Sequence, residues 1–190
     1  MGIQTVHKQQ YWLVAIVAAF VGATLTWEHL NGGVISHYLL HNPNYPSISN
    51  YWGMLVLPTL AWVAAHRVIK RMKLEDEENK NVAVAIPKHV KMGFAIMFCV
   101  TALQSIAWVL GHQDITMYLA LGMLVAGLFV PIYRSECILA HVLASSVIFG
   151  AVIPLLGMLI MASISAVSNL VIKPVIVKLS TRLRTVKAIQ

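Results

Sequence analysis

The basic residues of this chain are confined to four patches, and no other feature of the sequence constrains the fold as strongly. Lys8 and Arg134 each stand alone, seven Lys and Arg residues fall between positions 67 and 91, and five between 173 and 187. The long stretches without Lys or Arg are 9–66, 92–133 and 135–172. Basic loops are retained on the cytoplasmic side when a membrane protein inserts. The pattern therefore predicts an integral membrane protein whose Lys and Arg residues all lie on one side.

The composition also favours a membrane location. Hydrophobic residues make up 58% of the chain and charged residues only 11%, which is too little charge for the surface of a soluble domain. The net charge of +7 is confined to short loops and one tail, so we expect anionic headgroups of the inner leaflet as the partner and no nucleic acid. We expect a single integral membrane domain over residues 1–190, in a bacterial inner (plasma) membrane.

Six segments are apolar enough to cross a bilayer, which takes about 20 helical residues. The predicted spans are 11–27, 51–69, 90–110, 115–133, 137–157 and 160–179. The last two come from one uncharged run, 137–172, which at 1.5 Å per residue would make a helix of roughly 54 Å, too long for one crossing. We expect a turn near residues 157–163 to divide this run.

The number of spans follows from the charges. Five spans would leave the last basic patch outside, whereas six spans place both termini in the cytoplasm with every Lys and Arg. The predicted fold is an all-α polytopic membrane protein with six transmembrane helices, a cytoplasmic loop at 70–89 and a long outer loop at 28–50. The apolar run near the N-terminus continues to Trp27, so we expect an uncleaved first span and not a signal peptide.

Two prolines and two cysteines lie in the apolar segments. Pro58 and Pro154 fall inside the predicted second and fifth spans, where each should kink its helix by removing a hydrogen bond. Cys99 and Cys137 lie at different predicted depths, so no disulfide is expected.

Histidines and carboxylates gather on the predicted outer side, where no Lys or Arg occurs. The residues are Glu28, His29, His37, His41, His112 and Asp114. We expect residues 34–41 to form a short interfacial helix, which would bring His37 and His41 onto one face because they are four apart. Such a pair suits a divalent transition metal (Zn, Cu, Ni or Fe), with the other side chains completing the site. A metal-free proton sensor, a cation-attracting surface and a plain interfacial loop are the alternatives.

A second polar cluster is predicted near the inner side, formed by His66, Glu136 and His141. Ionisable groups inside a membrane are functional candidates by default, and these could form a proton or ion path. In the structural alternative, Glu136 pairs with Arg134 or with the start of its own helix, and His141 bonds a backbone carbonyl.

The sequence contains none of the motifs of common enzyme classes: no P-loop, no GxSxG, no GxGxxG and no HExxH. The leading hypothesis is a small membrane protein that binds or conducts a small solute or cation through the outer His/Glu cluster. A metal-dependent membrane enzyme acting on a lipid or quinone is the first alternative, and a structural or assembly subunit is the second. Each is compatible with a homo-oligomer or a partner membrane subunit.

Overall fold

The computed structural model describes residues 3–39, 42–79 and 86–187, with side chains over 8–39, 42–73 and 86–181. The helices are α1 (Ile3–Leu30), α2 (Gly53–Asn79), α3 (Lys88–Val109), α4 (Gln113–Phe129), α5 (Ser135–Phe149), α6 (Val152–Val167) and α7 (Lys173–Lys187). A 3₁₀ turn, η2 (Asn50–Trp52), precedes α2, and a π-helical segment, η3 (Ser168–Ile172), joins α6 to α7.

This architecture confirms the all-helical class. Within the described residues, four helical stretches are long and apolar enough to cross a membrane: Lys8–Leu30, Asn50–Lys73, Lys88–Val109 and Val152–Thr181. They indicate an integral membrane protein. Helices α4 and α5 are apolar but shorter. The six crossings and the cytoplasmic termini stay predictions.

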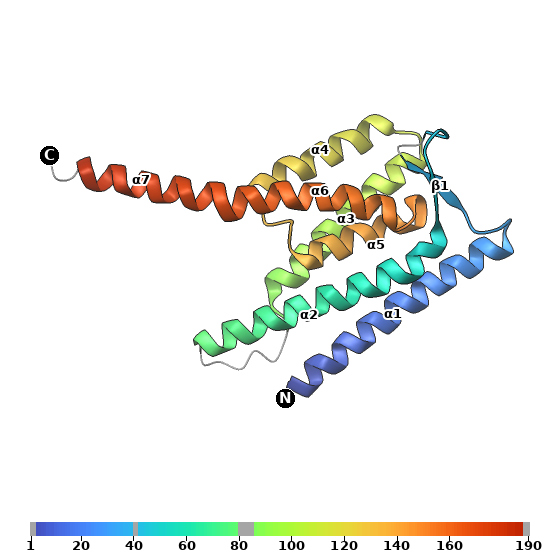
Figure 1. Cartoon of the computed structure of the whole chain (residues 1–190), viewed down its shortest axis with the longest axis horizontal. Helices are drawn as coiled ribbons and strands as arrows, with labels where there is room; N and C mark the ends of the chain where they lie inside the picture. The colour runs from blue at the N-terminus through green and yellow to red at the C-terminus, as the bar shows by residue number, and fades with distance from the viewer. Residues whose placement is uncertain (1–2, 40–41, 80–85, 188–190) are drawn as a thin grey trace.

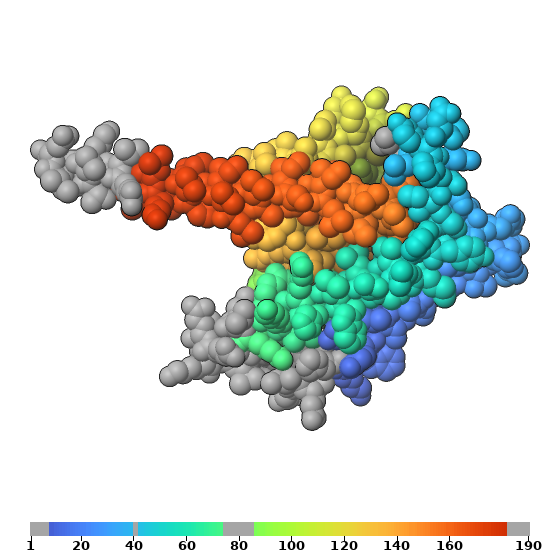
Figure 2. All heavy atoms as spheres, in the orientation of Figure 1, coloured from blue at the N-terminus to red at the C-terminus, as the bar shows by residue number. Residues whose placement is uncertain are grey.

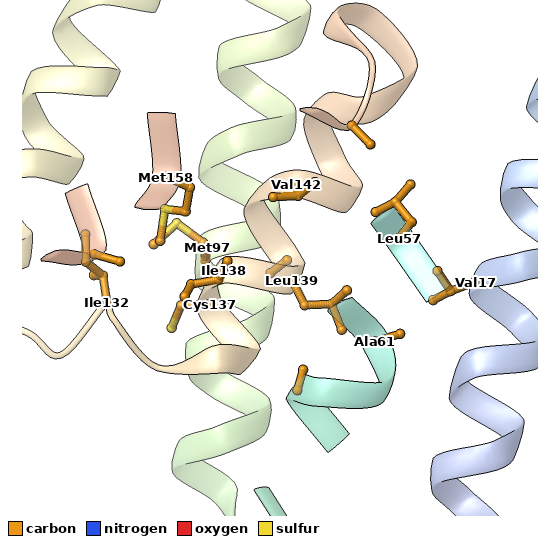
Figure 3. Close-up of a cluster of buried hydrophobic side chains, with 14 of the residues drawn as sticks. Val17, Leu57, Ala61, Met97, Ile132, Cys137, Ile138, Leu139, Val142 and Met158 are labelled. Carbon is orange, nitrogen blue, oxygen red and sulfur yellow. The ribbon is translucent and has the colours of Figure 1, made fainter. Parts of the chain in front are cut away.

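Helix α5 is the centre of the bundle, and Figure 1 shows it between the other helices. It contacts α2, α3 and α6, while α1 packs on the far side of α2 and α4 packs against α3 and α6. Its first eight residues, 135–142, are all buried. In Figure 3, Leu139 and Val142 of α5 lie opposite Leu57 and Ala61 of α2, where they form the core.

The boundary between α5 and α6 differs from the prediction. The chain turns at Gly150 and Ala151, not near residues 157–163, and Gly150 has a φ of 69°. Pro154 is consequently the third residue of α6, not part of the preceding helix. Its missing N–H is not needed in a first helical turn, so the kink predicted from Pro154 is wrong.

Helices α6, η3 and α7 follow one another without a break, and together they make a long rod that extends beyond the bundle (Figures 1 and 2). The π segment coincides with a set of side chains that bind the end of α4. Ser165, Ser168 and Asn169 donate to the carbonyls of Val130, Leu128 and Gly127 at 3.1, 2.8 and 2.9 Å. These bonds satisfy carbonyl groups that a helix end leaves without intrahelical partners.

The outer loop forms a β-hairpin and not the predicted interfacial helix. Strand β1 (Ser36–Tyr38) pairs antiparallel with β2 (Ser47–Ser49), and His37 lies opposite Ile48. Gly32 and Gly33, with φ of 118° and 105°, lead the chain out of α1. In a strand, alternate residues face opposite sides, and His37 is half-buried between exposed neighbours. The helical pairing of His37 with His41 is therefore wrong, and His41 lies outside the described residues.

Candidate functional site

Two polar regions occupy opposite ends of α5. The first is at the end where α1 finishes, the hairpin begins and α5 turns into α6, at the right of Figure 1. Here Glu28, in the last turn of α1, accepts hydrogen bonds from Asn50 Nδ2 at 2.7 Å and from the backbone N of Ile35 at 3.1 Å. The Asn50 N–H donates to the Ile35 carbonyl at 3.0 Å. One carboxylate thus fastens both ends of the hairpin to α1.

Asn50 is the innermost residue of this region, with an exposed fraction of 7%. Its Nδ2 is bound to Glu28, and its Oδ1 has no hydrogen-bond partner among the described residues. That oxygen faces the turn at Gly150, where an added Cβ would lie 2.5 Å from Asn50 Oδ1 and 3.3 Å from His37 Cδ2. A glycine is therefore required where the hairpin meets the end of α5.

A small hollow of about 20 Å³ lies between these elements. We call it the outer pocket; its polar lining comes from Thr24, Glu28, Asn50 and Ser146, and Gly150 closes one side. The volume matches a single water-sized particle.

The structure does not assemble the predicted outer cluster. Glu28 lines the outer pocket and His37 lies near Gly150, but His29, His112 and Asp114 are exposed on the surface. Over the described ranges, no three His, Cys, Asp or Glu residues come close enough to hold a metal ion. The metal interpretation of the six residues stays a prediction, because His41 lies outside the described residues. Asn50 was not predicted, because an uncharged amide in a turn-rich stretch resembles a helix cap.

At the other end of α5, the predicted inner cluster is divided between separate contacts. Glu136 is buried, with 5% exposed, and forms an ion pair with Arg71 of α2, so the predicted pairing with Arg134 is wrong. His141 Nδ1 lies 2.9 Å from the Thr101 hydroxyl of α3, which replaces the predicted backbone carbonyl. His66 is exposed on α2.

A groove of about 640 Å³ lies beside the Glu136 ion pair, and we call it the inner groove. Helices α1 and α3 form its walls through residues such as Trp12 and Phe94, and α2 and α5 contribute Ala65 and Leu139. Twelve of its sixteen lining residues are apolar, and its polar members are Gln9, Gln10, Lys91 and Glu136. Its volume is within the range of small-molecule sites, roughly 300–1,000 Å³. No charge pattern in the sequence predicted this groove, since it depends on how four helices are arranged.

Comparison with known proteins adds no assignment. No protein-family model, no curated protein and no solved structure matches this chain.

Proposed function

We propose that this protein binds an anionic membrane lipid, with one acyl chain in the inner groove and the headgroup beside Lys91. The observation that carries the proposal is the lining of the inner groove, which is apolar along α1, α2 and α3 and charged at Lys91 and Glu136. An amphiphile has the same division between a long apolar part and a polar end. The proposal concerns binding, and it assigns no reaction.

The groove is open on the side that would face the bilayer. Trp12 and Ile16 of α1 are 61% and 62% exposed, whereas Ala64 and Leu139 are both 2% exposed. The walls are thus accessible and the floor is sealed by protein. Inside a membrane, the apolar molecules that can enter such a groove are lipid chains, and burying a chain requires no desolvation of polar groups.

The charges around the groove favour an anionic headgroup. The Glu136 carboxylate is paired with Arg71, so it does not repel an anion as an isolated carboxylate would. Of the described residues that line the groove, Lys91 is the one with a basic side chain. A basic residue near an anionic membrane surface contributes about 1 kcal/mol of attraction.

The test is lipid retention measured by native mass spectrometry after reconstitution with phosphatidylglycerol or phosphatidylcholine. We expect about one retained lipid per chain, with phosphatidylglycerol preferred by about fivefold, which corresponds to the attraction of one Lys. Lys91→Gln should remove this preference, and Ala65→Phe, which fills the groove, should remove retention of both lipids.

Two variants are matched controls. Val63→Phe adds the same ring to the same helix outside the groove lining, and Lys88→Gln removes a neighbouring charge that does not line the groove. Both should retain phosphatidylglycerol and keep the preference for it over phosphatidylcholine. Equal retention in Ala65→Phe and Val63→Phe would refute the groove as the site, and a preference for phosphatidylcholine would refute the anionic headgroup.

A further inference from the structure

We propose that the outer pocket binds a single small monovalent cation of the size of Na⁺. The pocket, about 20 Å³ in volume, has room for one such particle. The site is separate from the inner groove, at the other end of α5, and does not depend on lipid binding.

The polar residues that line the pocket, Thr24, Glu28, Asn50 and Ser146, each have a side-chain oxygen that can act as a cation ligand. The Thr24 hydroxyl donates to the Val21 carbonyl and the Ser146 hydroxyl donates to the Leu143 carbonyl, each at 2.9 Å. Because a hydroxyl has one proton, both oxygens are left as acceptors only. Hard cations prefer such hydroxyl, carboxylate and amide oxygens.

Asn50 is an independent indication of a ligand. Its side chain is more than nine-tenths buried and is oriented by the bond from Nδ2 to Glu28, so Oδ1 cannot turn toward another donor without breaking that bond. Among the described residues Oδ1 has no donor. A buried acceptor without a partner is unfavourable, so a cation or another donor at this oxygen would be stabilising.

The local charge favours a cation over a water molecule. Glu28 supplies a carboxylate at the pocket. The dipoles of the surrounding helices offset one another, because α1 and α5 end here while α2 and α6 begin here. No Lys or Arg occurs in residues 9–66 or 135–172. A single carboxylate balances one positive charge, whereas Ca²⁺ sites take six to eight oxygens and commonly several carboxylates.

The test is the thermal unfolding of the detergent-purified protein in NaCl or choline chloride at equal ionic strength. A ligand at free concentration L that binds only the folded state stabilises that state by RT ln(1 + L/Kd), and it therefore raises the Tm as its concentration increases. We expect Na⁺ to raise the Tm over choline in a concentration-dependent manner. In Thr24→Val and Ser146→Ala, each of which deletes one lining oxygen, the apparent affinity should fall by about tenfold.

Two variants delete the same kind of hydroxyl outside the pocket. Thr26→Val removes a hydroxyl that donates to the Gly22 carbonyl at 2.7 Å, and Ser163→Ala removes one that donates to the Leu159 carbonyl at 2.8 Å. Both should keep the full response to Na⁺.

Equal Tm values in Na⁺ and choline would refute the site and indicate a water molecule at Asn50. An Na⁺ response unchanged in both pocket variants would place the ion elsewhere and also refute the proposal. A stronger response to micromolar Ca²⁺ than to Na⁺ would refute the monovalent assignment.

Discussion

Glu136 is a buried carboxylate whose counter-ion comes from a different helix. It lies in the first turn of α5, where a negative charge also benefits from the helix dipole, and Arg71 reaches it from the C-terminal part of α2. Removing one partner of a buried ion pair leaves the other charge uncompensated, whereas replacing both partners by apolar residues is often neutral. The pair therefore connects α2 and α5 without itself being a large net source of stability.

Single and double variants of this ion pair should separate these effects. We expect Glu136→Leu to lower the free energy of unfolding by about 3 kcal/mol, near the lower limit for a broken buried pair because Arg71 is partly exposed. The double variant Glu136→Leu, Arg71→Met should recover at least half of that loss. Reversible unfolding in detergent measures both. If the double variant is less stable than Glu136→Leu, Arg71 has an additional structural role that this interpretation omits.

At the level of elements, the turn between α5 and α6 lies at Gly150, next to Asn50 at the end of the hairpin. Gly150 has φ of 69° and ψ of 177°, a conformation that is essentially restricted to glycine. A Cβ added at Gly150 would also collide with Asn50 Oδ1, so the turn, the end of the hairpin and the outer pocket all require glycine at this position. The predicted turn region contains another glycine, Gly157, but that residue lies within α6 and an added Cβ there meets no atom within 4 Å.

The two glycines should respond oppositely to alanine. Gly150→Ala is expected to lower the free energy of unfolding by about 2 kcal/mol or more, from backbone strain alone, before the contact with Asn50 is considered. Gly157→Ala should raise it by about 0.5–1 kcal/mol, because alanine loses less conformational entropy in a helix. Thermal unfolding of both variants side by side is the measurement. A tolerated alanine at position 150 would contradict the turn geometry.

At the level of the whole molecule, a short central helix is surrounded by longer ones. The fifteen residues of α5 span roughly 22 Å, less than the hydrocarbon thickness of about 30 Å. Both ends of α5 are therefore expected to lie below the membrane surface, where polar groups require partners from neighbouring elements. The inner groove and the outer pocket are found at these two ends. The arrangement explains why Glu136 and His141 of α5 find their partners on α2 and α3.

The predicted orientation can be tested by labelling single cysteines with a membrane-impermeant reagent, after Cys99 and Cys137 are replaced by alanine. Ser36→Cys and Gln113→Cys should react in intact cells, because the distribution of Lys and Arg predicts that the hairpin and the start of α4 lie outside. Asn79→Cys and Thr185→Cys should react only after the membrane is opened. Labelling of Thr185→Cys in intact cells would contradict the six-span orientation based on the distribution of Lys and Arg.

The sequence by itself determined the properties that depend on residues individually. The free energy of inserting a helix into a membrane is nearly the sum of the contributions of its side chains. The apolar runs and the confined Lys and Arg patches therefore predicted an all-helical membrane protein. The same reasoning placed Glu28 and His37 in one loop region. Local patterns could not determine whether that loop forms a helix or a hairpin, because both are compatible with its glycines, prolines and asparagines.

The tertiary structure alone decided which residues become partners. Arg71 and Glu136 are 65 positions apart, and they meet because α2 packs against α5. Asn50 and Gly150 are 100 positions apart, and they meet because the end of the hairpin lies against the turn after α5. The inner groove likewise exists only between four packed helices. Ion pairs, buried amides and cavities depend on distances across the bundle, and a linear pattern of charge and hydropathy contains no information about those distances.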